Sequence, residues 1–228
     1  MIKLIKLEMK KHKFGWYWRG AAIANLLIIV LLWLIPFTAD DGASFANFEG
    51  VYTSMGLIVR ATFTVFASVL ISRLIIDEYK NKTVTVLFTY PVPRKKLIAA
   101  KLVLIMGMTL FTNLASLVVI ATAFNIINAY FDFFPGTQSL DVLIEQGFRL
   151  FIHAISAAGV GLIPLYFGMR KKSVSSTIVS SILLAAVINS NNNDFSLGSF
   201  LSVSITLAVI GILIAYLSFR NIDRTDLI

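Results

Sequence analysis

The sequence predicts an all-α membrane protein with six transmembrane helices, an N-terminal interfacial helix and a cytoplasmic helix between the second and third spans. Hydrophobic residues make up 57% of the 228 positions and charged residues only 14%, and the mean hydropathy is +0.83, values that soluble domains rarely reach. Six apolar windows, each close to the roughly 20 residues that cross about 30 Å of hydrocarbon, are separated by polar breaks. We therefore expect residues 1–228 to form a single transmembrane domain.

Residues 1–19 are predicted to form an amphipathic, cationic helix along the cytoplasmic membrane surface. Apolar and basic side chains would occupy two neighbouring stripes of this helix: Ile2, Ile5, Met9 and Trp16 on one, and Lys3, Lys6, Lys10 and Lys13 on the other. Aromatic residues at 16–18 then precede the first span, at the depth where amphipathic rings favour the membrane interface. A basic tail without a helix of its own is the alternative.

The spans are expected at residues 20–37, 57–76, 102–125, 150–168, 174–188 and 197–219. All Lys and Arg residues except Arg60 and Arg149 then lie on one side of the membrane or at its interface, and more than half of the acids lie on the other side. By the positive-inside rule the basic side is cytoplasmic, so both termini are expected inside the cell. The net charge of +8 is therefore read as a topological signal, with no nucleic-acid partner.

Arg60 and His153 are the candidate pathway residues, because an ionisable group inside a span is a functional hypothesis by default. Arg60 lies near the outer end of the second span, so we favour snorkelling of its side chain to the interface. For His153 we favour an interhelical hydrogen bond over catalysis. Small residues in the same span at 154, 157, 158 and 161 favour the close approach of another helix, and the Ser and Thr residues between 173 and 181 favour small polar packing.

Motifs of nucleotide hydrolysis and metal catalysis are absent from the sequence. There is no G-x-x-x-x-G-K-[ST], so the chain has no Walker loop and is not expected to be an enzyme that hydrolyses nucleotide. There is no cysteine and no H-E-x-x-H, and His12 and His153 are far apart. We expect no catalytic residue, and no cofactor or metal bound by this chain.

The longest polar interruption between two apolar runs is residues 77–101. Asp77 and Glu78 stand near the start of a short predicted helix, where acids complement the positive end of the helix dipole. Pro91 and Pro93 end that helix, because proline lacks the backbone N–H that a helix interior requires. We therefore predict one short cytoplasmic helix within this segment.

Val84, Leu87 and Phe88 form an apolar ridge on this predicted helix, since they are spaced three and four residues apart. Charged residues flank the ridge on both sides, and the basic run that begins at Arg94 is suited to lipid headgroups. A ridge of this kind suits either a membrane surface or the groove of a partner protein.

The segment also carries a motif: an acid, a threonine, a Pro-x-x-Arg and a lysine, at Glu78, Thr83, Pro91, Arg94 and Lys101. With this motif and its six-span pattern, the chain resembles the permease subunits of ABC-2 type ABC transporters, in particular peptide or bacteriocin export and immunity permeases. The resemblance departs from the family pattern at position 82, where lysine replaces the usual glycine and leaves the spacing intact.

The resemblance implies that residues 77–101 contain a coupling helix, which inserts into a separate ATPase subunit and passes its ATP-driven closure to the spans. ATP and Mg²⁺ would bind to that ATPase. The other implied partners are a second permease copy, identical or paralogous, and the lipid of the bacterial cytoplasmic membrane. The residues expected to contact the ATPase are Glu78, Thr83, Val84, Leu87, Phe88, Tyr90, Pro91 and Arg94.

We therefore expect the permease subunit of an ATP-driven exporter. Spans rich in Phe and aliphatic residues favour amphipathic or hydrophobic cargo, such as antimicrobial peptides or lipids. The alternative is a non-transporting membrane anchor or assembly protein that recruits a cytosolic partner. A membrane enzyme, the least favoured class, requires Arg60 and His153 to share a site.

Overall fold

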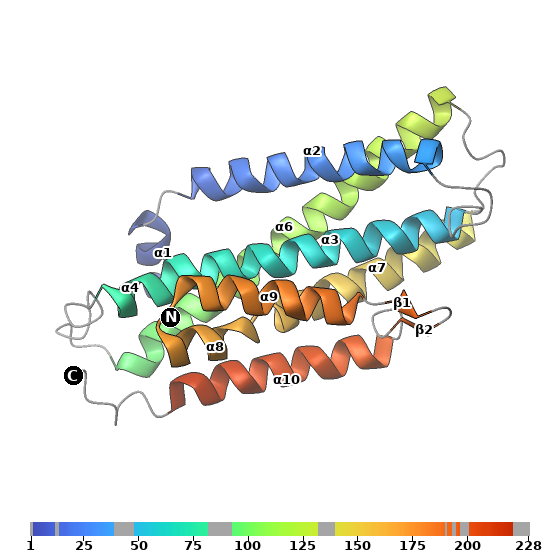
Figure 1. The fold of residues 1–228 in the computed structure, drawn as a ribbon. Coiled ribbons are helices and arrows are strands. Elements are labelled where there is room, and N and C mark those ends of the chain that lie inside the picture. The colour runs from blue at the N-terminus through green and yellow to red at the C-terminus, as the bar shows by residue number, and fades with distance from the viewer. Residues whose placement is uncertain are drawn as a thin grey trace.

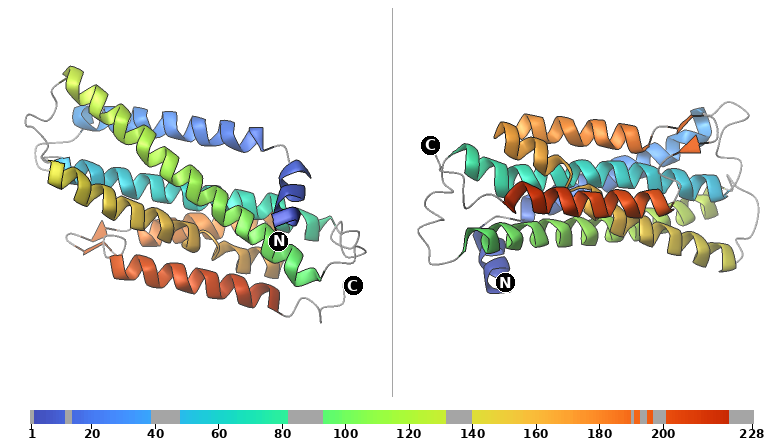
Figure 2. Two further views of the ribbon diagram at one scale, coloured as in Figure 1. Left: turned by 180° about the vertical axis from the view of Figure 1, so that it is seen from behind. Right: turned by 90° about the horizontal axis from the view of Figure 1, so that it is seen from below.

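The structure, a computed structural model, describes residues 2–11, 14–38, 48–81, 93–131, 140–189, 191–192, 195–196 and 201–220. Over these ranges it is a bundle of helices that run roughly along one axis, joined at its two ends (Figures 1 and 2). The helical segments are α1 (Ile2–Lys11), α2 (Gly15–Thr38), α3 (Phe48–Ile71), the π-helical turn η1 (Ser72–Ile76), α4 (Asp77–Lys80), α6 (Arg94–Phe131), α7 (Leu140–Val160), α8 (Pro164–Lys171), α9 (Val174–Ile188) and α10 (Leu201–Arg220).

Within the described residues the prediction of an all-helical fold is confirmed, apart from one small strand pair. Among the described residues, four helical stretches are long and apolar enough to cross a membrane: Gly15–Leu34, Gly50–Lys80, Lys95–Phe131 and Ile144–Lys171. The shorter helices α9 and α10 are also apolar. Between them, β1 (Asn191–Asn192) pairs antiparallel with β2 (Phe195–Ser196), a hairpin that the sequence did not predict.

Two of the predicted helices are divided in the structure. The single helix expected over residues 1–19 is divided, since α1 ends at Lys11 and α2 begins at Gly15. Glycine in a helix interior costs about 1 kcal/mol relative to alanine, which favours a boundary there. The span expected at 150–168 is divided by a turn before Pro164, because proline removes a helical hydrogen bond and its ring crowds the preceding turn.

Helix α3 lies at the centre of the bundle and contacts α2, α6, α7 and α9. One core cluster, which includes Leu70, Leu74 and Ile105, joins α3 and η1 to α6 and α8. A second cluster around Met55 and Phe63 joins α3 to α2, α6 and α7. Helix α2 is much less buried than α3 and presents an apolar outer face, as expected for a helix that contacts lipid.

Small residues allow close helix contacts, as the sequence predicted for residues 154–161. Ala154, Ala157 and Ala158 are buried, and a Cβ atom added at Gly161 would lie 2.7 Å from the Cβ of Ala67 on α3. The small polar packing predicted for α9 is also present, since the hydroxyl of Ser181 donates to that of Ser68 on α3 at 2.8 Å. Small side chains therefore let backbones approach where longer ones would separate them.

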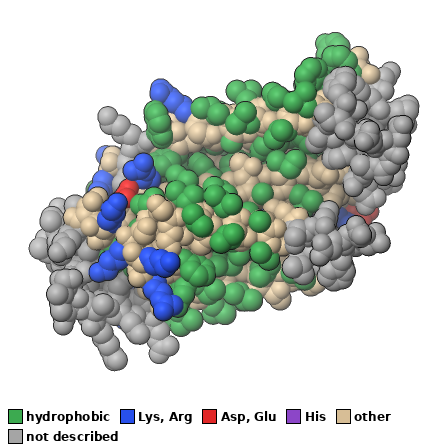
Figure 3. Space-filling model, viewed as in Figure 1, with side chains coloured by type: hydrophobic (Ala, Val, Ile, Leu, Met, Phe, Trp, Pro, Cys, Tyr) green, Lys and Arg blue, Asp and Glu red, His purple; other side chains and the backbone are tan. Residues whose placement is uncertain are grey.

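Basic side chains gather at one end of the bundle, the end that carries α1, α4 and the turn between α8 and α9 (Figure 3). The exposed ones include Lys3, Lys6, Lys10, Lys80, Lys95, Lys96, Arg170 and Lys171. The end of α10 lies at the same end (Figure 1). We call it the basic end and the other the distal end.

We predict that Gly211→Ala destabilises the protein, because α7 and α10 cross at this glycine. A Cβ atom at Gly211 would lie 2.9 Å from the carbonyl carbon of Gly159, and the backbone there cannot rotate away. Overpacking of this kind costs about 1–3 kcal/mol. The measurement is the thermal unfolding midpoint of the purified protein in detergent.

The matched control is Gly107→Ala on α6, where an added Cβ meets nothing within 4 Å. It should leave the midpoint unchanged or raise it, since alanine is favoured over glycine in helices by about 1 kcal/mol. Equal midpoints for the two variants would contradict the close crossing.

Candidate functional site

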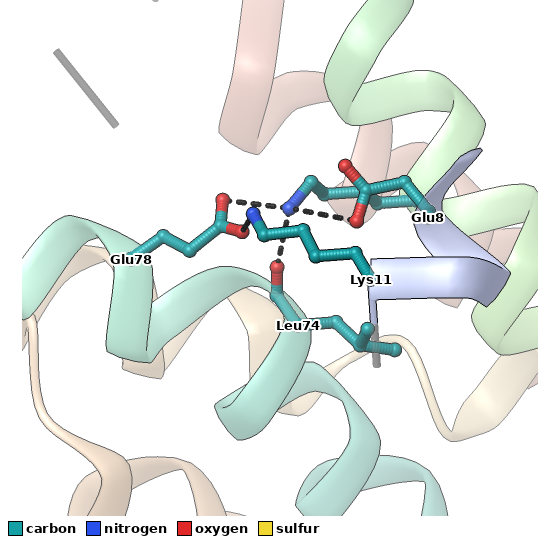
Figure 4. A network of polar contacts seen from close by, with 5 residues as sticks. Glu8, Lys11, Leu74 and Glu78 are labelled. Carbon is teal, nitrogen blue, oxygen red and sulfur yellow. Dashed lines mark hydrogen bonds and ion pairs between the residues drawn. The ribbon is translucent and has the colours of Figure 1, made fainter. Parts of the chain in front are cut away.

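A buried network of ion pairs at the basic end connects α1, α4 and α6 (Figure 4). The Nζ atom of Lys101 lies 2.6 Å from Oε2 of Glu78 and 3.4 Å from Oε2 of Glu8. The Nζ atom of Lys11 lies 2.6 Å from Oε1 of Glu78. Two lysines and two glutamates thus meet with balanced charge. We call these four residues the basic-end network.

Lys101 stands on the face of α6 that packs into the core, where Ile98 and Ile105 are its neighbours one turn away on either side. Its side chain is only 2% exposed, and that of Glu78 is 9% exposed. A charge buried to this extent is costly unless it is paired and hydrogen-bonded. The apolar face of α6 can therefore accommodate a lysine only because the glutamates meet it.

A backbone carbonyl completes the surroundings of Lys101. Its Nζ atom donates a hydrogen bond of 2.8 Å to the carbonyl oxygen of Leu74. Leu74 lies in η1, where the backbone has the wider π-helical register and the N–H of Asp77 donates to the carbonyl of Ser72. Such π-helical turns inside longer helices occur frequently at functional sites. Lys101 thus contacts the π-helical turn η1 as well as the glutamates of α1 and α4.

The network fixes the two ends of the segment that the sequence singled out. Glu78 lies in α4, which ends at Lys80, and Lys101 lies in the second turn of α6, which begins at Arg94. Removing one partner of a buried ion pair typically costs about 3–5 kcal/mol. Residues 82–92 are therefore joined at both ends to helices that are held together.

Of the residues predicted to contact the ATPase, the structure describes the side chain of Glu78 only. Glu78 is described, and its carboxylate points inward to Lys101 and Lys11. The remaining contacts were Thr83, Val84, Leu87, Phe88, Tyr90, Pro91 and Arg94. Apart from the backbone of Arg94, these lie outside the described residues. The short helix and its apolar ridge therefore stay predictions.

Arg60 corrects the expectation of snorkelling. Its side chain is buried in the bundle, where Nη2 donates to Oδ1 of Asn189 at 2.9 Å and Nη1 lies 3.5 Å from Oγ of Ser204. Asn189 is the C-cap residue of α9, and the carboxyl end of a helix favours a cation. The carboxyl end of α9 thus gives the Arg60 guanidinium a polar partner inside the bundle, so its side chain need not reach the membrane interface.

His153 makes the interhelical contact that the sequence favoured. Its Nδ1 atom lies 3.3 Å from Oγ of Ser204 on α10. Since Ser204 also lies near Arg60, the two candidate pathway residues are brought into one polar cluster. The cluster joins α3, α7, α9 and α10.

Several of these residues were missed by reasoning from sequence. Glu8 gave one signal, because it is the only acid in residues 1–19. Asn189 and Ser204 gave none, since they lie 129 and 144 positions from Arg60 and are common residue types. Side-chain partners at such separations depend on how the helices pack.

Comparisons with known proteins agree with the resemblance noted in the sequence. The family described as "ABC-2 family transporter protein" matches residues 4–189. A relative from Bacillus subtilis (strain 168), described as "Uncharacterized protein YcbO", is 42% identical over 227 residues, which cover 99% of this chain and 100% of the relative. No solved structure matches the chain. Because the family match covers most of the sequence, the chain belongs to the ABC-2 transporter family and is an ABC-2 type permease.

Proposed function

We propose that this permease is the membrane subunit of an ATP-driven exporter, and that residues 77–101 couple a separate ATPase to its helices. Membership of the family implies the transport role and the ATPase partner. One observation carries the coupling role: the basic-end network ties together the helices on both sides of residues 82–92. ATP and Mg²⁺ would bind to the ATPase.

A rigid base would make this segment an effective lever. Coupling between distant sites passes through rigid helices and polar networks. A push on residues 82–92 would reach α4 and α6 at the same time, because Glu78 and Lys101 join them. It would then reach α3, which continues into α4 through η1 and contacts α6, α7 and α9. In this proposal Glu78 positions the lever, and Val84, Leu87 and Phe88 enter the groove of the ATPase.

We further propose that α9 and α10 cross the membrane, which gives six spans with both termini in the cytoplasm. Helix α9 has 15 residues and α10 has 20, or about 22 and 30 Å at 1.5 Å per residue. The gathering of Lys and Arg at the basic end supports a cytoplasmic location for that end (Figure 3). Helix α1 would lie at the same surface of a bacterial cytoplasmic membrane.

The proposed cargo is amphipathic or hydrophobic, such as an antimicrobial peptide or a lipid. The apolar outer faces of α2, α9 and α10 support contact with lipid or with a second permease copy. Arg60 and His153 remain the candidate pathway residues. A non-transporting anchor would share the binding of a partner, but its partner's ATP hydrolysis would not respond to this chain.

Replacement of Val84, Leu87 and Phe88 by aspartate should weaken binding of the ATPase about tenfold or more, because apolar anchors supply most of the free energy of such contacts. Co-purification and permease-dependent ATP hydrolysis measure the effect. The control replaces Thr85 and Thr89, which lie outside the ridge on the predicted helix, with aspartate. Normal binding and hydrolysis with the ridge replaced would disprove the coupling assignment.

Lys101→Met should lower the unfolding free energy by about 3–5 kcal/mol, because it leaves Glu8 and Glu78 with one lysine between them. Permease-dependent ATP hydrolysis should fall as well. Lys96→Met is the matched control, since Lys96 is an exposed lysine near the start of the same helix.

Adding Glu8→Gln to Lys101→Met should restore part of the lost stability, because Lys11 and Glu78 then remain as a balanced pair. A double-mutant cycle of thermal unfolding midpoints measures this coupling. Simple additivity of the two single changes would contradict a shared network.

A further inference from the structure

Helix α1 runs across the axis of the bundle at the basic end (Figures 1 and 2). Its 10 residues cover about 15 Å at 1.5 Å per residue. Helix α2, which follows it in the chain, is long and apolar enough to cross a membrane. With α2 across the membrane, α1 lies along the membrane surface, where one of its sides meets the bundle and the other can meet lipid.

The two sides of α1 carry opposite charges. Glu8 faces the bundle, where its side chain is buried and pairs with Lys101. Successive residues of a helix are rotated by about 100°, so the opposite side of α1 carries Lys3, Lys6 and Lys10, which are exposed. We call these three lysines the basic face of α1.

The basic face has no carboxylate of its own. Among the described residues, no ion pair includes one of its three lysines. The lysines follow one another at spacings of three and four residues, so they are neighbours on the helix surface and repel each other. A helix of 10 residues is also shorter than the roughly 12–15 residues at which isolated helices are marginal in water. An anionic partner on this side would therefore stabilise α1.

Exposed apolar side chains adjoin the basic face. Leu7 and Met9 of α1 are exposed, and each lies three or four residues from one of the three lysines. Trp16 and Trp18 are exposed at the start of α2, and such rings favour the depth of the lipid headgroups. Cations beside apolar side chains match a lipid surface, where anionic headgroups lie next to acyl chains.

We propose that the basic face of α1 binds the headgroups of anionic phospholipids, and that bound headgroups hold α1 against the basic-end network. The lysines attract the headgroup phosphates, while Glu8 and Lys11 join α1 to Lys101 and Glu78. A ligand that binds the docked helix stabilises the docked arrangement. The content of anionic lipid in the membrane thus changes the stability of the base of residues 82–92.

The test uses the purified full-length permease in an uncharged detergent. Binding of phosphatidylglycerol is measured by native mass spectrometry, and the thermal unfolding midpoint is recorded with each lipid, with phosphatidylcholine as the zwitterionic comparison. Phosphatidylglycerol should bind and raise the midpoint more than phosphatidylcholine does. The proposal rests on the proposed position of α1 at the membrane surface and not on coupling to an ATPase. Its failure would leave the coupling proposal standing, because these measurements use the permease alone.

Replacement of Lys3, Lys6 and Lys10 together by glutamine should weaken binding of phosphatidylglycerol at least about tenfold. Each lysine near an anionic surface contributes about a fivefold gain in affinity, and all three side chains are exposed, so the fold should not depend on them. The rise of the midpoint with phosphatidylglycerol should disappear as well.

The matched control replaces three exposed cations of the turn between α8 and α9 with glutamine: Arg170, Lys171 and Lys172. It removes the same charge from the same end of the bundle and should retain both the binding and the rise. Glu8→Gln keeps the basic face but removes the contact with Lys101. It should still bind phosphatidylglycerol, but the midpoint should rise less.

Loss of binding in the α1 variant, with retention in the control, supports the site. The proposal is overturned if phosphatidylglycerol binds no better than phosphatidylcholine, or if the α1 variant and the control lose equally. An equal rise of the midpoint in Glu8→Gln and the unchanged protein would overturn the link to the network. If the α1 variant keeps its lipid but no longer co-purifies with the ATPase, the basic face serves the ATPase, and the proposal is wrong.

Discussion

The buried ion pair between Lys101 and Glu78 is the constraint on which the basic end of this permease depends. Neither charge could remain in the core without the other, because desolvation of an unpaired ion costs several kcal/mol. Helix α6 must therefore meet α4 at this point, and α1 must approach through Glu8 and Lys11. The pair also explains why an acid and a lysine stand at the two ends of the motif: they close the base of the segment between them.

Much of the fold followed from the sequence, because hydropathy over windows of about 20 residues is a local property. The helical architecture and the one-sided distribution of Lys and Arg needed no knowledge of packing. The helix breaks at Gly15 and before Pro164 are marked in the sequence by the glycine and the proline themselves, but both lie in or beside apolar runs that hydropathy alone reads as continuous. The pairing of Lys101 with Glu78, and of Arg60 with Asn189, required helix packing that no window of sequence contains.

The two ends of the bundle differ in their electrostatics. At the basic end the buried lysine is matched by glutamates, which makes a rigid junction of balanced charge. In the distal half the guanidinium of Arg60 lies inside the bundle, where it contacts Asn189 and Ser204. Arg60 lies on α3 and Leu74 on η1, which continues α3, so this one helical stretch connects the two regions. In the proposed function, movement imposed on α4 by an ATPase would pass along this helix toward Arg60 and its polar contacts.

A structure of the permease with its ATPase bound is the decisive test of coupling through residues 77–101. If residues 77–101 couple the two subunits, Val84, Leu87 and Phe88 will occupy a groove of the ATPase while Lys101 and Glu78 remain within ion-pair distance. An ATPase seated instead on the turn between α8 and α9, with residues 82–92 making no contact, would contradict it. So would a bound state in which α4 and α6 separate and the ion pair is lost.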